Sequence, residues 1–272
     1  MDDGSVSRGA GGVPAQGRLK IDFTGTSPVG AGTSNAPLAV TRSAVAYVVR
    51  LLLGRAAPLN DGLIDPVDVV VPEGSLLHPV FGETDERCPP VAGGNVETSQ
   101  RVVEALVRVF GLCAGGAGTM NNLLLGAEGF GVYETIASGA GATASSPGAD
   151  AVQTHMTNTA ITDAEVLEHR TPLRVRRFAI RRGSGGSGVR AGGEGVVREI
   201  ESLARVSLTL LTQRRRDGAP GALGGSAGAA GAQRIVREDG SVVPLGWSAH
   251  EMLEPGDRVM IETPGGGGWG AG

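Results

Sequence analysis

Four short polar segments hold the residue types that could perform chemistry on a small molecule, and each is expected to lie in a glycine-rich loop. They are Gly93–Ser99, Gly118–Asn122, Tyr133–Thr135 and His155–Thr159. Carboxylates and imidazoles can transfer protons, amides can hydrogen-bond a polar ligand, and glycine lets the backbone approach that ligand closely. The same residue types also cap helices and turns, and composition alone favours that structural role. The segments predict a binding site for a small polar substrate, with a purely structural function as the alternative.

Individual residues in these segments suggest distinct tasks. Glu97, Glu134 and His155 are the candidates for proton transfer or for orienting a catalytic group. The candidates for hydrogen-bonding an amide or a carboxylate are Asn95, Asn121, Asn122 and Asn158. Metal ligands stay unassigned, because the histidines His78, His155, His169 and His250 lack a recognised metal-ligand spacing.

Two nucleotide-binding motifs can be set aside. Gly183–Gly188 spells Gly-x-Gly-x-x-Gly, but no predicted helix follows it to receive a pyrophosphate, so a flexible turn is favoured. Lys20 is the sole lysine, and it lacks the preceding glycine spacing of a Walker A loop. If ATP is used, another chain is expected to bind it.

Helices and a strand are expected to position the polar segments in the first half of the chain. Apolar periodicity predicts one helix from about Pro37 to Leu53 and another from Thr98 or Ser99 to Gly111. A third short helix is predicted over Asp163–Arg170. The β-branched run Val67–Val71, bounded by prolines, predicts a strand.

From Leu173 onward the sequence changes to short β-rich runs separated by glycine clusters. The runs are Leu173–Arg182, Val196–Ile200, Val206–Leu211, Gln233–Arg237 and Arg258–Ile261, and Asp239-Gly240 predicts a hairpin turn. Gly265–Gly268 is too flexible for a strand and favours a mobile tail, with a backbone surface against a ligand or subunit as the alternative.

The expected fold class is α+β, with mixed helices and strands in the first half and mainly antiparallel β-structure in the C-terminal half. Three divisions are expected along the chain. Residues 1–18 form a disordered lead-in, residues 19–172 an α+β portion with glycine-rich polar loops, and residues 173–272 a β-rich portion packed on it.

Composition excludes several classes of partner. The 272 residues carry a net charge of −4 and are 3% aromatic, so neither nucleic acid nor an anionic membrane is an expected partner. The two cysteines, Cys88 and Cys113, are too few for a disulfide framework, which indicates a reducing compartment. No signal peptide or membrane span is visible, and a cytoplasmic location is expected.

A series of sequence words resembles the hydantoinase B/5-oxoprolinase family. In family order, these words are Ile21–Ser27, Asn35–Pro37, Gly94–Gln100, Gly118–Asn122, His155–Thr159, Ser184–Gly188, Arg190–Glu199 and Thr263–Gly270. The resemblance therefore spans nearly the whole chain. Trp269 replaces the more usual Tyr, a mild departure because both side chains are amphipathic aromatics.

The resemblance implies which components this chain lacks. In the family, His and Asp metal ligands lie upstream of the Asp-Phe-Thr-Gly-Thr word, whereas the residues before Ile21 contain no His. The chain alone is thus expected to bind no cofactor. ATP and Mg²⁺ are expected on a hydantoinase A-type ATP-binding subunit, and a divalent metal is expected from the missing upstream segment.

The resemblance also implies a function. The chain is expected to be a B-type subunit, or the C-terminal fragment of one, in an ATP-dependent cyclic-amide hydrolase that acts on a small lactam. It would work in a hetero-oligomer and be inactive alone. A non-catalytic assembly module or remnant is the alternative, and related acetone-carboxylase-type chemistry is a third possibility.

Overall fold

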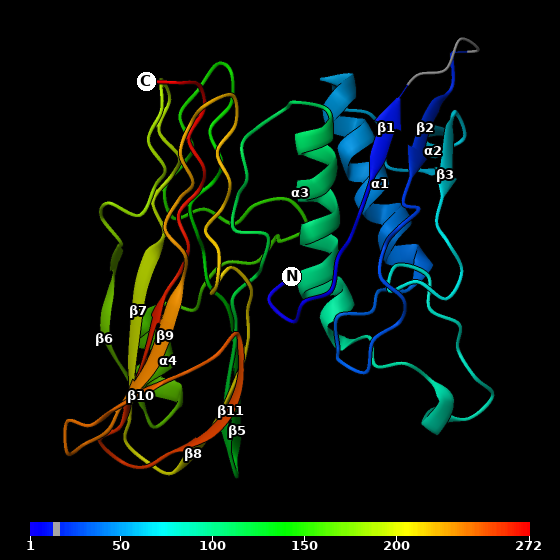
Figure 1. Cartoon of the computed structure of the whole chain (residues 1–272). Helices are drawn as coiled ribbons and strands as arrows, with labels where there is room; N and C mark the ends of the chain where they lie inside the picture. Colours follow the sequence, from blue (N-terminus) through cyan, green and yellow to red (C-terminus); the bar gives the residue numbers. More distant parts are fainter. Residues whose placement is uncertain (13–16) are drawn as a thin grey trace. The chain divides into compact units, whose positions relative to one another are not determined.

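The computed structural model describes residues 1–12 and 17–272, which divide into two compact units (Figure 1). Unit 1 contains Met1 and residues 3–112, and unit 2 contains Asp2 and residues 113–272. The change in sequence character at Leu173 therefore falls inside unit 2. Part of the expected disordered lead-in, residues 13–16, lies outside the described residues, whereas Ala10–Gly12 of the same segment forms a strand.

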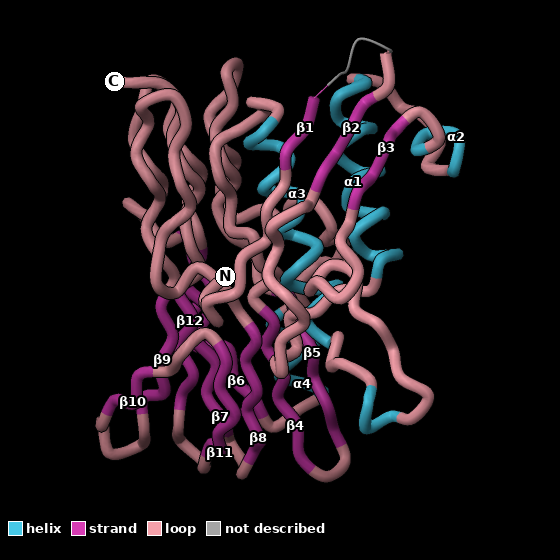
Figure 2. Tube along the Cα trace, turned by 45° about the vertical axis from the view of Figure 1, so that its right-hand side comes forward, coloured by secondary structure: helices cyan, strands magenta, loops and turns pink. Residues whose placement is uncertain are grey.

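Unit 1 combines a small sheet with helices. Its strands are β1 (Ala10–Gly12), β2 (Leu19–Asp22) and β3 (Val67–Val70), and its helices are α1 (Leu38–Leu53), α2 (Asp61–Ile64), the 3-10 turn η1 (Asp85–Arg87), the π-helical turn η2 (Gly94–Thr98) and α3 (Ser99–Val109). The sheet order is β1-β2-β3, with β1–β2 antiparallel and β2–β3 parallel. Figure 2 shows this sheet lying along α1 and α3.

Apolar side chains explain why the predicted helices form where they do. Val45 and Val48 of α1 and Val102 and Leu106 of α3 are completely buried, and the two helices pack against each other. Helix α1 ends at Gly54, whose φ of 59° is the left-handed conformation typical of a helix C-cap. The predictions of both helices, and of the strand that became β3, are confirmed.

Unit 2 is built on two mainly antiparallel sheets. The first has the order β10-β9-β12-β7-β6 and the second the order β11-β8-β4-β5. The elements are β4 (Asn122–Ala127), β5 (Phe130–Thr135), α4 (Ala164–Arg170), β6 (Leu173–Ile180), β7 (Val196–Ser202), β8 (Val206–Leu211), β9 (Ala232–Val236), β10 (Val242–Pro244), β11 (Ser248–Leu253) and β12 (Arg258–Glu262). Buried aliphatic side chains from both sheets, including Leu123, Leu208, Ile200 and Val259, form one core. The α+β fold class is confirmed.

Local predictions for unit 2 succeed where apolar periodicity is strong. Helix α4 is capped by Asp163, whose Oδ1 accepts hydrogen bonds from Glu165 N–H and Val166 N–H. The Asp239-Gly240 hairpin joins β9 to β10, with Gly240 at a φ of 84°. One prediction is wrong: Tyr133–Thr135 lies on strand β5 and not in a loop, because the hairpin with β4 pairs it along its length.

Glycine-rich segments above the sheets pack backbone against backbone. Gly266 N–H donates to Gly193 C=O, Gly193 N–H donates to Ala140 C=O, and Gly186 N–H donates to Gly266 C=O. We call residues 113–121, 136–152, 181–195, 213–231 and 263–270 the glycine bundle. A Cβ on Gly192 would lie 2.0 Å from Gly266 O, so only glycine permits this spacing.

The glycine bundle corrects two expectations. Gly265–Gly268 is buried and hydrogen-bonded, so it is not a mobile tail. The segment Gly183–Gly188 is not a flexible turn either, because Gly186 and Gly188 pack against the backbone of residues 268–270. Both segments are ordered for the same reason. Glycine has no side chain, so the backbones come close enough for their N–H and C=O groups to hydrogen-bond to one another.

Within the described ranges, no helix is both long enough and apolar enough to span a bilayer.

Asp257 fixes the turn that precedes β12. Its carboxylate accepts hydrogen bonds from Glu254 N–H (2.9 Å), Arg237 Nη1 (2.7 Å) and Glu238 N–H (3.0 Å). Burial raises the pKa of Asp257, but these hydrogen bonds outweigh burial and hold its pKa below the ordinary value of 3.8. The stabilisation that the ionised Asp257 carboxylate gives to the fold is therefore complete above pH 3.8. It is lost as the pH falls through the lower pKa that Asp257 has in the folded state.

We expect Asp257→Asn to lower the free energy of unfolding by about 1–3 kcal/mol at pH 7, because three donors lose the charged acceptor that a buried carboxylate gives them. Denaturant unfolding over a pH series should show the difference from wild type shrinking in the acid range. The exposed Asp217→Asn is the control and should stay close to wild type. A pH-independent difference would contradict this account.

Candidate functional site

Glu134 joins the two sheets of unit 2 through a buried ion pair. It lies on β5, and both its carboxylate oxygens accept hydrogen bonds from Arg198 Nη2 on β7, each at 3.0 Å. Both side chains are 1% exposed. The Arg198 guanidinium also lies 5.1 Å from the centroid of the Phe178 ring. The carboxylate predicted to move protons is thus held in a charge-neutral contact between strands.

Asn121 is fully buried beside the start of β4, with its backbone at a φ of 47°. Its Nδ2 donates to Ile136 O at 3.0 Å and to Ser138 Oγ at 2.7 Å, while its Oδ1 accepts from Arg215 Nη2 at 2.9 Å. Protein groups therefore occupy both donor and acceptor positions of this amide. Arg215 extends the network, because its Nε donates to Gln233 Oε1 at 3.1 Å.

Asn122 holds an exposed aromatic ring. Its Nδ2 donates to Leu211 O at 2.7 Å, and its Oδ1 accepts from the Tyr133 hydroxyl, also at 2.7 Å. The Tyr133 residue is 53% exposed, whereas Asn122 is 2% exposed. Asn122 thus fixes the orientation of a ring that solvent or a ligand can reach.

The segment that contains His155 and Asn158 is tied to the end of β5 at two points. Gln153 Nε2 donates to Thr135 O and to Thr135 Oγ1, both at 3.0 Å, and the hydroxyls of Thr135 and Thr159 share a hydrogen bond. Between these anchors, His155 is half-buried with a φ of 57°, and Asn158 is exposed. A left-handed conformation at a non-glycine residue is uncommon and is found at functional sites.

Asn95 and Glu97 belong to unit 1, on η2. Asn95 is exposed, whereas Glu97 is 1% exposed. Gly94 lets this turn approach its neighbour, because a Cβ there would lie 2.5 Å from Asn35 O. A π-helical turn at the start of a helix is an uncommon feature that often accompanies function.

The structure brings Asn121, Asn122 and Glu134 together at one end of β4 and β5. The segment that contains His155 and Asn158 is attached to the same strand end, because Gln153 donates a hydrogen bond to Thr135, the last residue of β5. Asn95 and Glu97 form a separate group in unit 1. In the part of the chain that the structure describes, no group of three His, Cys, Asp or Glu residues is arranged to hold a metal ion.

Three residues of this region carried no functional assignment from the sequence: Arg198, Arg215 and Gln153. A signal existed for Arg198, because Arg198 and Glu199 are charged residues within the run Val196–Ile200, whose other members are apolar. A charge in a buried strand indicates a buried partner. Arg215 and Gln153 have no comparable signal, since their partners are distant in sequence.

Comparison with known proteins gives concordant results. The family model for hydantoinase B/oxoprolinase matches residues 2–272. The chain is 43% identical to 5-oxoprolinase 1 of Arabidopsis thaliana over 100% of its own length, but spans 21% of that relative.

Two solved structures share the fold. The ATP-dependent caprolactamase of Pseudomonas jessenii has a TM-score of 0.77 at 19% identity, covering 99% of this chain and 53% of the other. Acetone carboxylase has a TM-score of 0.73 at 20% identity, covering 96% of this chain and 40% of the other. The sequence match, which runs from residue 2 to residue 272, shows that the chain belongs to the hydantoinase B/oxoprolinase family.

Proposed function

We propose that this chain forms part of an ATP-dependent hydrolase that opens a small cyclic amide, together with a hydantoinase A-type component that binds ATP. The match to the hydantoinase B/oxoprolinase model over residues 2–272 carries the proposal. The relative named 5-oxoprolinase 1 and the structural similarity to an ATP-dependent caprolactamase support a lactam as the substrate class. The chain spans about a fifth of the 5-oxoprolinase, so further chain or subunits would complete the enzyme.

Phosphorylation explains why such an enzyme would use ATP. In the proposed reaction the ATP-binding component phosphorylates the lactam oxygen, which weakens amide resonance and makes the ring carbon susceptible to water. Water then adds to that carbon, and the ring C–N bond breaks as the nitrogen takes up a proton. A second water releases phosphate, so the products are the open-chain amino acid, ADP and phosphate. The described residues of this chain hold no metal-ligand set, and its proposed contribution is to bind the substrate and to transfer protons. Proton transfer of this kind contributes about 10²–10⁴-fold to a rate.

The contacts divide the candidate residues by task. His155 and the exposed Asn158 lie on the anchored segment and are proposed to meet the substrate. Asn95 is exposed on η2 and is proposed as a further hydrogen-bonding group, with Glu97 beside it as a proton-transfer candidate. Glu134 is proposed to orient the site through Arg198.

Asn121 and Asn122 are proposed to shape the site at the strand end. Asn121 fixes the backbone before β4, and Asn122 presents the Tyr133 ring. Their substrate contact would be made through these neighbours, because their amide groups are already hydrogen-bonded.

The proposed function is tested by ADP release from the assembled enzyme. The chain, its remaining family partners and ATP are combined with 5-oxoproline, hydantoin or caprolactam, and ADP is measured with and without each lactam. We expect lactam-dependent ADP release with at least one of them. Absence of lactam-dependent release from a correctly assembled complex would contradict the hydrolase proposal for these substrates.

His155→Gln is expected to lower kcat in that assay by about 100-fold or more, because a proton-transfer group is lost. The exposed His169→Gln on α4 is the control and should retain wild-type turnover. Equal rates for the two variants would remove His155 from the catalytic candidates.

A second candidate function is carboxylation, favoured by the shared fold with acetone carboxylase. It predicts ADP release that depends on acetone and bicarbonate and not on a lactam. The same assembled complex can be tested with both substrate sets.

A further inference from the structure

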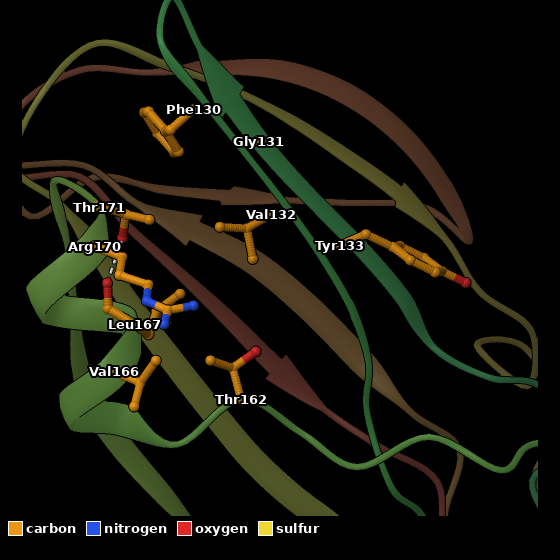
Figure 3. Close-up of a pocket in the computed structure, with 9 residues that line it drawn as sticks. All are labelled: Phe130, Gly131, Val132, Tyr133, Thr162, Val166, Leu167, Arg170 and Thr171. Atoms are coloured by element: carbon orange, nitrogen blue, oxygen red, sulfur yellow. Dashed lines mark hydrogen bonds between the residues drawn. The ribbon is translucent and has the colours of Figure 1, made fainter.

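A pocket of about 360 Å³ opens between the edge strand β5 and helix α4 in unit 2 (Figure 3). At the roughly 30 Å³ that liquid water occupies per molecule, this volume holds about a dozen non-hydrogen atoms. It lies within the range of small-molecule sites in proteins. The pocket is therefore large enough for a small organic ligand.

Apolar side chains line two sides of the pocket. Phe130 and Val132 of β5 form one side, and Val166 and Leu167 of α4 form the other. Phe130 and Val132 also pack against the core of unit 2, whereas Val166 is 40% exposed at the rim. A ligand that fills this space would gain by burying an apolar body.

One charged side chain lines the pocket, and it is a cation. Figure 3 shows the guanidinium group of Arg170 directed into the space between Val132, Val166 and Thr162. Among the described residues, neither the Arg170 guanidinium nor the Thr162 hydroxyl takes part in a hydrogen bond or an ion pair. Two polar groups are thus available beside an apolar wall.

No carboxylate among the described residues forms an ion pair with Arg170. Asp163 is occupied as the N-cap of α4. Glu168 Oε1 accepts a hydrogen bond from Val175 N–H on β6 at 2.8 Å. No acidic residue is part of the pocket lining.

The backbone of β5 offers a further donor on the same side. Gln153 donates to Thr135 O, so the peptide groups of Thr135 point away from β4. Every second residue of a strand directs its peptide groups to the same edge of the strand. Gly131 lies four positions before Thr135 on β5, so its peptide groups point to the same edge as those of Thr135. The N–H of Gly131, which lines the pocket, therefore faces the open edge.

We propose that this pocket binds a small organic monocarboxylate with a compact apolar body. The carboxylate would accept hydrogen bonds from Arg170 and Thr162, and the apolar body would pack between Val132 and Leu167. Charge-assisted hydrogen bonds to a guanidinium are strong and directional, which gives preference for the anion over its neutral amide. The inference does not rest on the proposed function.

Calorimetric titration of the full 272-residue chain with hexanoate tests the proposal, with hexanamide as the neutral isostere. Saturable binding of hexanoate is expected below about 10 mM, with hexanamide at least tenfold weaker. Arg170→Gln should weaken hexanoate binding about tenfold or more, and Thr162→Val about threefold. Added salt should also weaken the binding of hexanoate but not that of hexanamide.

Arg177→Gln is the matched control, because Arg177 is an exposed arginine of β6 outside the pocket lining. It should leave binding unchanged. Val166→Trp places a large side chain at the exposed rim and should abolish binding while the unfolding midpoint stays at the wild-type value.

Four outcomes would overturn the proposal. One is the absence of saturable hexanoate binding to the wild-type chain. Another is equal affinity for hexanoate and hexanamide. The third is an equal loss of binding in Arg170→Gln and Arg177→Gln. Binding of an extended peptide to β5 with no binding of hexanoate would also overturn it, because the open strand edge would then be the recognition element.

Discussion

Gly266→Ala is expected to prevent unit 2 from folding stably. A Cβ at this position would lie 1.9 Å from Ala140 O and 2.8 Å from Gly141 N. Neither side can move away freely, because Gly266 N–H donates to Gly193 C=O and Gly266 C=O accepts from Gly186 N–H. Overpacking in a core costs about 1–3 kcal/mol when side chains can adjust, and here only backbone is available to adjust. We therefore expect a loss of more than about 3 kcal/mol.

Thermal unfolding of the purified chain measures this effect. For a unit of this size, a loss of more than about 3 kcal/mol lowers the midpoint by at least about 6 °C, and loss of soluble protein is the stronger form of the result. Gly131→Ala on β5 is the control, because a Cβ there meets nothing within 4 Å. Similar midpoints for the two variants would show that the glycine bundle tolerates side chains.

Glu134→Gln is expected to lower the free energy of unfolding by about 3–5 kcal/mol, because it leaves the Arg198 charge buried without its partner. Glu254→Gln provides the contrast. The Arg205–Glu254 pair has side chains 69% and 57% exposed, and such pairs contribute less than about 1 kcal/mol. Denaturant unfolding at pH 7 measures both variants, and equal losses would contradict the assignment of a buried pair.

A double variant separates stability from chemistry at Glu134. Glu134→Leu with Arg198→Met removes both charges, and replacing a buried pair by apolar residues is often close to neutral for stability. We expect the double variant to be more stable than Glu134→Gln. If turnover of the assembled enzyme returns with stability, Glu134 acts by holding the two sheets. If the stable double variant stays inactive, the charged pair itself is needed for the reaction.

Local sequence pattern predicts the elements whose stability comes from one apolar face. Helices α1 and α3 and strand β8 follow this rule, since their buried residues recur at helical or alternating spacing. Strand β5 escaped prediction because Gly131 and the polar residues 133–135 weaken its alternation. The strand is stabilised by backbone hydrogen bonds to β4, which the local sequence of β5 does not reveal.

Long-range partners explain what the sequence could not show. Glu134 meets Arg198, 64 positions away, and the amide of Asn121 meets Arg215, 94 positions away. The same residue types that suggest ligand binding thus satisfy one another inside the fold. Their roles in a reaction remain predictions. The packing of the glycine bundle could not be predicted for a related reason. A run of glycines has no pattern of apolar and polar side chains that indicates which segments it packs against.

The position of β12 affects how unit 2 assembles during synthesis. This strand lies between β9 and β7 in the middle of its sheet, and the residues that follow it thread through the glycine bundle. A ribosome delivers β12 after every other strand of that sheet. Until residues 258–270 emerge, the edges of β9 and β7 that β12 will join have no partner strand. Unpaired strand edges can associate with other chains, so we expect chaperone contact to matter most at this stage of synthesis.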